Sequence, residues 1–427
     1  MREGEIRAAG ELAGDALGGA GTLIRDIHAA TAGRVFRALG PLGAPTRFVH
    51  DRVSSAVYGA VSGGLSAPPR GAARLAARSA SKTAVSLANS VPGSVALGAL
   101  NGAFGDALSQ RGNELAMSMA FRRHGEDVTL DSEGVAAAYP DATPRIAVFV
   151  HGLCGTDEGW WLLPMSRSRA GRKSYGSRLR DDLGYTPVYL RYNTGLHISE
   201  NGRELARQLE QLVASWPVRV DEITLVGHSM GGLVARSACH YGSDADARWT
   251  QSVRHVFCLG SPHLGAPLER AANAAGHALA RLPETRPLAK LVNGRSVGIK
   301  DLRFGNVVET DWCDCDPDEF LNDRCCEVPF LECATYYFVG ATITKSEKSP
   351  LGRAIGDLLV QLPSASGNGK RRRIPFEVDN GRHLGGLTHF DLLNNADVYA
   401  LIRDWIDRPR AAELPAPQKL LEASTSS

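Results

Sequence analysis

The sequence lacks a strong excess of either charge. Its 427 residues contain 48 lysines and arginines against 46 aspartates and glutamates, which gives a formal net charge of +2. Proteins that bind nucleic acid usually carry a marked basic excess, so this near balance does not support a nucleic-acid partner. Apolar residues make up 43% of the chain, an ordinary share for a folded soluble protein. The length allows one large α/β domain with an accessory region.

Signals for export and for membrane spanning are weak. Residues 1–30 carry five acidic side chains and no compact apolar core, so we expect no signal peptide and a cytoplasmic protein. The longest uncharged run, residues 83–105, has the length of a membrane span. It contains three serines, two asparagines and a proline, which argue against spanning.

Cysteine is too sparse for a small disulfide scaffold, because a chain of this length has only eight. Five of them cluster: Cys313, Cys315, Cys325, Cys326 and Cys333. Their spacing lacks the paired Cys-x-x-Cys pattern that is typical of zinc sites, and the nearby aspartates lack the order of a calcium loop. We favour reduced structural thiols, and keep disulfides and metal binding as alternatives.

Residues 1–125 have helical character and almost no strand signal. Apolar residues recur at helical spacing, and prolines at positions 41, 45, 68, 69 and 92 predict several short helices. Between Arg34 and Lys82 there are eight basic residues and one acid, Asp51. Such helices could dock on an anionic membrane or lipid surface. Alternatively, they pack on the main domain with their arginines solvated.

After residue 126 the pattern changes to short apolar runs that alternate with helical stretches. Strands are expected over 145–150, 186–192, 222–226, 254–260 and 335–341, and helices between them, notably over 199–216. Apolar strands that alternate with helices predict a mostly parallel sheet covered on both faces, an α/β fold. We expect a loop over 362–373 and disorder after residue 409.

Ser229 lies between glycines directly after one of these apolar runs. The sequence there predicts a strand over 222–226, then Gly-x-Ser-x-Gly, then a helix. In such a turn the serine backbone is strained, and Gly227 and Gly231 remove side chains that would collide with the neighbouring strand and helix. We therefore predict that Ser229 is a nucleophile, and that the N–H of Met230 faces a developing oxyanion.

An oxyanion hole requires a second N–H group, which in this architecture comes from the turn after an earlier strand. The strand expected over 145–150 ends in His151 and Gly152. We predict that Leu153 donates the N–H and that Gly152 lets the chain turn close to the substrate. His151 precedes the serine, whereas the expected order is serine, acid, histidine. We therefore interpret His151 as a structural residue of the turn.

The general base is expected after the serine. Four of the six histidines that follow it lie within predicted elements or come too early in the chain: His240, His255, His263 and His277. His383 and His389 remain. We prefer His389, because it lies in a Gly-rich loop that opens onto a final helix over 396–406.

The acid is expected after a late strand and before the histidine. Asp357 follows the strand predicted over 335–341 and lies beside Gly356 and an apolar run. A carboxylate there can hold one imidazole tautomer and stabilise the imidazolium. An ordinary structural carboxylate is the alternative for Asp357. Rival acids lie upstream of that strand, at Asp311, Asp314, Asp316 and Asp318.

Together these motifs resemble the α/β-hydrolase superfamily, of the bacterial lipase and esterase type. "VFVHGL", "GHSMGG", "GSPHLGAP", "GDLLV" and "GLTHFDLLN" occur in the family's order, over about residues 142–408. The resemblance implies an α/β-hydrolase fold with a catalytic domain over 126–410 and no cofactor. The remaining residues, 411–427, form the tail that we expect to be disordered from its composition. Leu358 is a departure, because a glycine is common there in the family. This departure weakens the assignment of Asp357.

The resemblance also implies roles for the residues. Ser229 would attack an acyl carbonyl, His389 would act as base and then as acid, Asp357 would orient it, and water would release the acyl-enzyme. Asp391 matches a position that helps bind calcium in some bacterial lipases. Residues 101–122 resemble a segment found ahead of the hydrolase domain in some actinobacterial lipase-like proteins.

About seventy residues, over 264–334, separate two of these motifs, too many for a bare loop in a compact domain. In hydrolases an insertion there often caps the site, and an Ala-rich helix over 270–284 would suit an apolar acyl ester or lipid. The alternative is an insertion that packs away from the site.

We expect a carboxylic ester hydrolase, a lipase or esterase, with peripheral lipid contact through residues 1–125 as the further hypothesis. One alternative is another acyl-transfer enzyme, such as a thioesterase, transacylase or polyester depolymerase. The other is an interaction protein at a lipid or granule surface with little turnover.

Overall fold

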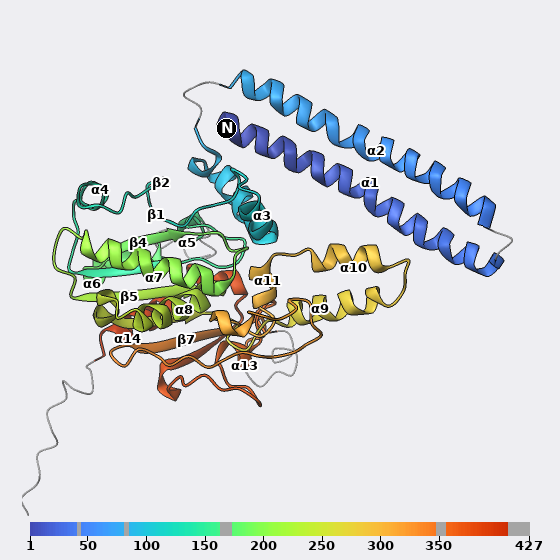
Figure 1. Ribbon diagram of the computed structural model, residues 1–427. Coiled ribbons are helices and arrows are strands. Elements are labelled where there is room, and N and C mark those ends of the chain that lie inside the picture. The colour runs from blue at the N-terminus through green and yellow to red at the C-terminus, as the bar shows by residue number, and fades with distance from the viewer. Residues whose placement is uncertain (41–43, 81–84, 163–172, 347–355, 409–427) are drawn as a thin grey trace, which may run out of the picture.

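A computed structural model describes residues 1–40, 44–80, 85–162, 173–346 and 356–408. It contains a central sheet with helices on both faces, and a long two-helix hairpin that extends beside it (Figure 1). The tail that we predict to be disordered, 411–427, lies outside the described residues.

The sheet has eight strands in the order β2-β1-β4-β3-β5-β6-β7-β8. All pairs from β4 to β8 are parallel, and β1 pairs antiparallel with β2 and β4. The five predicted strands are confirmed: β3 (Arg145–Val150), β4 (Thr186–Arg191), β5 (Glu222–His228), β6 (Val253–Leu259) and β7 (Thr335–Thr342).

Both faces of the sheet are buried. Along β3, Ile146 and Val148 face one hydrophobic cluster, whereas Ala147 and Phe149 face the other. Because both faces are covered, each strand is apolar throughout instead of alternating with polar residues. The first cluster is closed by α7 (Ile198–Ala214) and α8 (Met230–Asp244), and the second by α6 (Tyr175–Leu183) and α14 (Ala396–Ile406).

The strand order indicates where a ligand site is expected. The connection after β3 leads to β4 on one side, and the chain then crosses back to β5 on the other side of β3. In parallel sheets, ligands bind outside the carboxyl ends of the two strands at which the direction of connection reverses. Here these strands are β3 and β5, so residues 151–153 and Ser229 lie where this rule predicts a ligand site.

Three strands were not predicted: β1 (Ala120–Arg123), β2 (Glu126–Asp127) and β8 (Gly381–Gly385). They are short and contain arginines, acids or glycines, so they lack the apolar run of the inner strands. The predicted domain boundary between residues 125 and 126 falls inside the β1–β2 hairpin.

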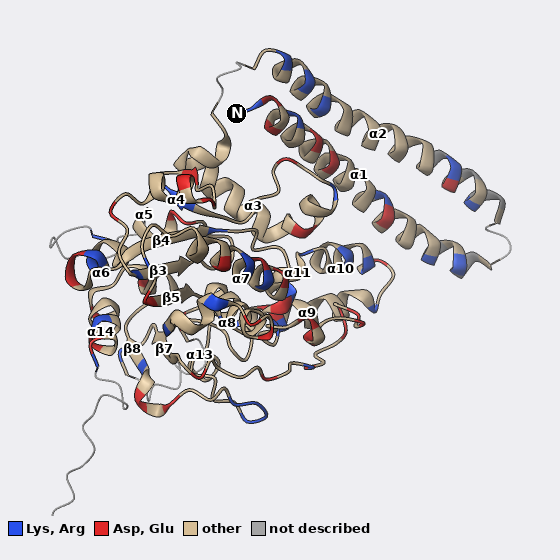
Figure 2. Cartoon of the chain, turned by 60° about the vertical axis from the view of Figure 1, so that its left-hand side comes forward, with Lys and Arg blue, Asp and Glu red and all other residues tan. Residues whose placement is uncertain are grey.

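The prediction of several short N-terminal helices is wrong. The structure has two long antiparallel helices, α1 (Glu3–Leu39) and α2 (Ala44–Arg78) (Figure 2). Pro68 and Pro69 lie inside α2. A proline removes one helical hydrogen bond and crowds the carbonyl of the preceding turn, which is why the sequence pattern suggested breaks.

Helix α2 continues through these prolines because it packs against α1. A methyl group built on Gly10 would lie 2.1 Å from Cβ of Ala73, and one built on Gly14 would lie 2.7 Å from the carbonyl oxygen of Ser66. The two helices therefore touch through small residues on both sides of the prolines. This contact, which no local rule includes, compensates for the lost helical hydrogen bonds.

The hairpin meets the rest of the protein along one side of α1. Ala8 packs in a small cluster with Leu97 and Leu115. Farther along α1, Asp15 pairs with Arg111, and Arg34 pairs with Glu284 at 2.7 Å.

Helix α3 (Val91–Gln110) lies against the sheet domain. A methyl group on Gly98 would lie 2.9 Å from the carbonyl oxygen of Gly155, and one on Gly102 would lie 2.3 Å from Sγ of Cys154. Helix α3 therefore covers the turn that follows β3. Within the described ranges, no helix is both long and apolar enough to cross a membrane.

The insertion predicted over 264–334 contains ordered helices: α9 (Pro267–Ala280), α10 (Arg286–Asn293), α11 (Val297–Asp301) and the 3-10 turn η4 (Glu309–Asp311). Helices α9 and α10 form a second hairpin, which lies below α1 in Figure 1. Four leucines of this hairpin are exposed: Leu268, Leu282, Leu288 and Leu291.

The remaining elements are short. They are α4 (Ser132–Ala138), α5 (Gly159–Leu162), α13 (Leu362–Ala365) and the 3-10 turns η2 (Leu87–Asn89), η3 (Arg248–Ser252), η5 (Val378–Asn380) and η6 (His389–Leu393). Helix α13 lies at the start of the segment predicted as a loop over 362–373.

Candidate active site

Ser229 is the residue between β5 and α8. Its backbone angles, φ 55° and ψ −124°, belong to a region that residues with side chains rarely adopt. A methyl group on Gly227 would lie 2.4 Å from the backbone nitrogen of Gly232, and one on Gly231 would lie 2.2 Å from the carbonyl oxygen of Val150. Both positions therefore require a residue without a side chain.

The turn after β3 lies directly beside this elbow. A methyl group on Gly152 would lie 2.9 Å from Cβ of Ser229. Leu153 follows in the same turn. Met230 is the first residue of α8, so its N–H has no acceptor within the helix. The fold thus brings both turns that carry the predicted oxyanion donors next to the serine.

His151 is held within its turn. Its ring stacks on Tyr192 with a centroid distance of 4.3 Å, and its Nε2 accepts a hydrogen bond from the Tyr192 N–H at 3.3 Å. The Tyr192 hydroxyl donates to the carbonyl oxygen of His151 at 2.7 Å. Burial lowers the pKa of His151 to about 4, so the ring is neutral at pH 7.

Asp357 and His389 form a buried pair. Nδ1 of His389 donates to Oδ2 of Asp357 at 2.7 Å, and the backbone N–H of His389 donates to the Asp357 carbonyl oxygen at 3.0 Å. The second carboxylate oxygen of Asp357 accepts the N–H groups of Leu359 and Val360 at 3.0 and 2.8 Å. The carboxylate is therefore fixed at both oxygens, and Nε2 of His389 is left as the basic nitrogen.

The His389 ring lies close to the residues that follow β6, next to the elbow. The N–H of Ser229 donates to the carbonyl oxygen of Leu259 at 2.8 Å. A methyl group on the next residue, Gly260, would lie 3.2 Å from both Nδ1 and Cε1 of His389. Ser229 and His389 therefore both border residues 259–260.

His228, which was not among the predicted site residues, links the elbow at Ser229 to the loop that carries His389. Its Nε2 lies 3.0 Å from the carbonyl oxygen of His389, and the two rings lie 4.7 Å apart. Burial and the neighbouring His389 ring hold the pKa of His228 well below its usual value. The neutral ring can therefore donate its Nε2–H to that carbonyl. Its position immediately before Ser229 is the sequence feature that could have indicated a role for His228 at the site.

His383, the rival base, and Asp311, one of the rival acids, form hydrogen bonds with other parts of the chain. His383 lies on β8, where its Nε2 is 2.9 Å from Oγ1 of Thr342. The carboxylate of Asp311 accepts the N–H groups of Val307 at 2.8 Å and Cys326 at 2.6 Å, so it holds a loop of the insertion.

The cysteine cluster and Asp391 have local partners. All eight cysteines lie within the described ranges, and all are free thiols. Burial raises the pKa of Cys325, whose Sγ lies 3.0 Å from Oδ1 of Asn306. Asp391 accepts hydrogen bonds from the N–H and hydroxyl of Thr388, both at 2.7 Å. Among the described residues, no three His, Cys, Asp or Glu side chains are grouped to hold a metal ion.

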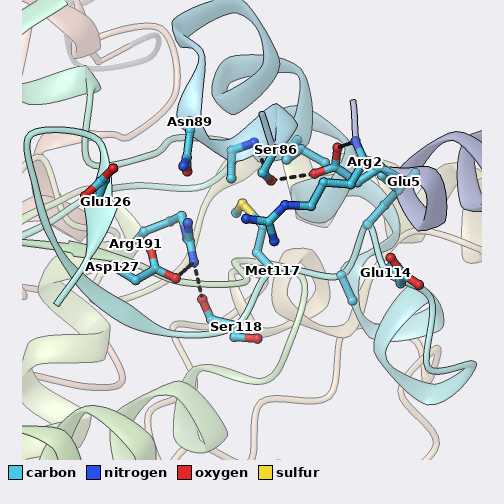
Figure 3. A pocket seen from close by; sticks show the side chains of 14 residues that line it. Arg2, Glu5, Ser86, Asn89, Glu114, Met117, Ser118, Glu126, Asp127 and Arg191 are labelled. Carbon is cyan, nitrogen blue, oxygen red and sulfur yellow. Dashed lines mark hydrogen bonds and ion pairs between the residues drawn. The ribbon is translucent and has the colours of Figure 1, made fainter. Parts of the chain in front are cut away.

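A polar hollow lies away from the candidate site, between the start of α1, η2 and the β1–β2 hairpin (Figure 3). Its side chains carry both charges: Asp127 pairs with Arg191 at 3.0 Å, and Glu5 accepts hydrogen bonds from Ser86 and from the Leu87 N–H. None of the candidate residues above lines this hollow, so we assign it no part in the chemistry.

Comparison with known proteins agrees with the topology. A family model described as "PGAP1-like alpha/beta domain" matches residues 142–316, which contain β3 to β6, the elbow and most of the insertion. The described residues have an α/β-hydrolase fold, with a mostly parallel sheet flanked by helices and a strand–elbow–helix at Ser229. The match covers less than half of the chain and ends before Asp357 and His389.

Solved structures of other α/β-hydrolases are similar at low sequence identity. Mature lipase BlEst2 of Bacillus licheniformis is 19% identical, with a TM-score of 0.38 over 61% of this chain and 91% of that one. EstA from Clostridium botulinum is 11% identical, with a TM-score of 0.34 over 62% and 86% of the two chains. No curated protein matches the sequence. Values this low say nothing about the substrate of this protein.

Proposed function

We propose that this α/β-hydrolase is a serine hydrolase that cleaves carboxylic esters through an acyl-enzyme. The observation that supports the proposal most directly is the 2.7 Å hydrogen bond between His389 and the doubly anchored carboxylate of Asp357. Two further observations support the proposal. The His389 ring borders Gly260, the residue after the Leu259 carbonyl that accepts the Ser229 N–H, and the strained backbone of Ser229 holds that serine at the carboxyl end of β5.

In the proposed reaction, Oγ of Ser229 attacks the acyl carbonyl while Nε2 of His389 takes the hydroxyl proton. Asp357 keeps Nδ1 protonated and stabilises the imidazolium that forms. The imidazolium then gives its proton to the departing alcohol as the bond from the acyl carbon to the alcohol oxygen breaks. Water attacks the acyl-serine with His389 again as base, which releases the carboxylic acid and restores the serine hydroxyl.

The oxyanion of each tetrahedral intermediate would be stabilised by the N–H groups of Leu153 and Met230. These N–H groups belong to turns that the sheet holds in place before substrate binds, so little reorganisation is needed during the reaction. The Met230 N–H also lies at the positive end of the dipole of α8.

We propose an apolar acyl group as the substrate class, because the insertion exposes apolar side chains that an apolar partner would cover. Its α9–α10 hairpin exposes four leucines, of which Leu268 and Leu291 are about two-thirds exposed. Leucines are favoured at such a surface when it meets a lipid or another apolar partner. A lipase or esterase that acts on apolar acyl esters is therefore the function we propose.

A fluorophosphonate probe tests the nucleophile. We expect covalent labelling of Ser229, loss of labelling and of turnover in Ser229→Ala, and normal labelling in the control Ser243→Ala, an exposed serine of the same helix. Labelling that persists in Ser229→Ala would disprove the assignment.

A chain-length series of p-nitrophenyl esters tests the substrate class. We expect kcat/KM to rise with acyl length, because a longer chain removes more apolar surface from water on binding. The thioester with the best acyl chain serves as the comparison. A clear preference for it would keep the serine chemistry but change the substrate class from esters to thioesters.

A further inference from the structure

His228 is the last residue of β5, and its ring is fixed on several sides. In the parallel register of β5 and β6 its backbone lies opposite Leu259. The ring meets Trp160 edge to face, with the ring planes at 83°. A methyl group on Gly152 would lie 3.1 Å from Nδ1 of His228. Because His228 is only 3% exposed, this ring has a defined place between the strand and the turn that follows β3.

The backbone of His389 has a partner at both of its polar groups. Its N–H donates to the carbonyl oxygen of Asp357 at 3.0 Å, and its own carbonyl oxygen lies 3.0 Å from Nε2 of His228. His389 begins η6, which is a 3-10 turn of five residues. Such turns have poorer hydrogen-bond geometry than α-helices. The position of His389 therefore depends on bonds to other parts of the fold.

The charge state of His228 sets the direction of its hydrogen bond. A carbonyl oxygen only accepts, so Nε2 of His228 must carry a proton for this bond to form. Burial lowers the pKa of His228 most, and the rings of His389 and His151 lower it further, whereas the bond to the carbonyl opposes them. The ring is therefore neutral at neutral pH, and its single proton is on Nε2.

This hydrogen bond connects the base to the strand that carries the nucleophile. His228 and Ser229 are consecutive in the chain. The bond between Asp357 and His389 orients the imidazole, but it joins two loops that both lie outside β5. Proton transfer requires Nε2 of His389 within hydrogen-bond reach of the serine hydroxyl. Loss of the tie to β5 should therefore slow the chemical step, because small displacements of reacting groups are costly.

We propose that His228 is a positioning residue, which donates its Nε2–H to the His389 carbonyl and thereby holds the base within reach of Ser229. His228 is not itself the base, because its Nε2 is directed at that carbonyl. The inference rests on the proposed serine hydrolase function, and its test therefore includes measurements that need no turnover.

Nitrogen-15 NMR of the histidine-labelled full-length wild type tests the hydrogen bond directly. The chain has twelve histidines, and the signals of His228 are identified by their absence from His228→Gln. At about pH 7 we expect a neutral ring with its proton on Nε2. A charged ring, or a proton on Nδ1, would overturn the proposal. This measurement uses the native chain, so it decides the question even if a variant fails to fold.

Two variants of nearly equal size separate the donor from the space that it fills. His228→Gln can place an N–H group near the position of Nε2, whereas His228→Met cannot. We expect His228→Met to lower kcat on the best p-nitrophenyl ester by at least about ten-fold. KM should change by less than about two-fold, because His389 acts in both acylation and deacylation. His228→Gln should keep kcat within about three-fold of the wild type.

The control variant is His240→Met, which replaces a partly exposed histidine of α8 and should leave the kinetics unchanged. A spectroscopic signature reports the same displacement without substrate. The Nδ1–H of His389, hydrogen-bonded to Asp357, should give a low-field proton signal in the wild type, His228→Gln and His240→Met. In His228→Met this signal should shift or broaden, because the base has moved relative to its carboxylate.

Wild-type kcat in His228→Met would overturn the proposal. Equal losses in His228→Met and His228→Gln would also overturn it, because they would show that the shape of the ring matters and its donor does not. Failure of the proposed function has a different outcome. In that case the wild type cleaves no ester, yet its low-field signal still shifts in His228→Met, and the positioning of His389 by His228 stands.

Discussion

Nδ1 of His389 lies 2.7 Å from Oδ2 of Asp357, and these two side chains are only 2% and 1% exposed. Water therefore does not compete for this hydrogen bond, and the carboxylate can fix both the tautomer and the direction of the ring. The two residues are 32 positions apart and belong to different loops. Their contact depends on the parallel placement of β7 and β8.

Asp357→Asn should lower kcat on the best ester by about 10⁴-fold, because an amide favours the wrong imidazole tautomer. Steady-state kinetics on the p-nitrophenyl series measure this effect. Asp314→Asn, in the rival acidic stretch and exposed, is the control and should behave like the wild type. If Asp314→Asn lost activity and Asp357→Asn behaved like the wild type, the catalytic acid would lie in the insertion.

Gly102→Ala should impair catalysis from outside the site. The added methyl group would lie 2.3 Å from Sγ of Cys154 and 3.0 Å from its backbone, so helix α3 or the turn with Leu153 must move. We expect kcat/KM to fall by about ten-fold or more, because small displacements of catalytic groups are costly. Gly59→Ala, in α2 and without a neighbour within 4 Å, should leave the kinetics unchanged. Equal activity of the two variants would show that α3 does not position this turn.

Leu358→Gly should not reduce stability, although leucine-to-glycine changes usually do. Leu358 has φ 89° and is mostly exposed, so glycine relieves backbone strain of about 1 kcal/mol and loses little buried surface. The greater freedom of the unfolded glycine chain costs about 0.5–1 kcal/mol and roughly offsets this gain. Leu291→Gly, inside α10, should instead cost about 1 kcal/mol. Urea unfolding measures both, and equal losses would contradict the prediction.

His197→Asn should cost more stability at low pH than at high pH. Burial lowers the pKa of His197, but the hydrogen bond and charge of Asp301, whose Oδ2 lies 3.0 Å from Nδ1, raise it overall. A raised pKa in the folded state adds stability that is complete below the unfolded pKa of about 6.5 and is lost as pH rises through the folded value. Urea unfolding at about pH 6 and about pH 8.5 compares the wild type with the variant. A difference that is the same at both pH values would show that the ion pair contributes nothing.

Local patterns in the sequence were sufficient for the inner sheet. Strands β3 to β7 are buried on both faces, so each is a nearly continuous apolar run that can be recognised without its neighbours. The elbow at Ser229 is equally local, because a sharp turn between a strand and a helix requires glycines at fixed positions around the serine.

Long-range packing decided the rest. The short polar strands β1, β2 and β8 form because an edge of the sheet is available to them, and α2 continues through Pro68 and Pro69 because α1 packs along it. Helix α3 covers the turn after β3, and His228 lies within hydrogen-bond distance of the carbonyl oxygen of His389. The residues in each contact are too far apart in the sequence for a local pattern to predict the contact. The sequence by itself predicted which residues carry the proposed chemistry. Only the tertiary structure decided that Asp357 and His389 meet, because a hydrogen bond between two loops exists only once the strands that carry them are paired.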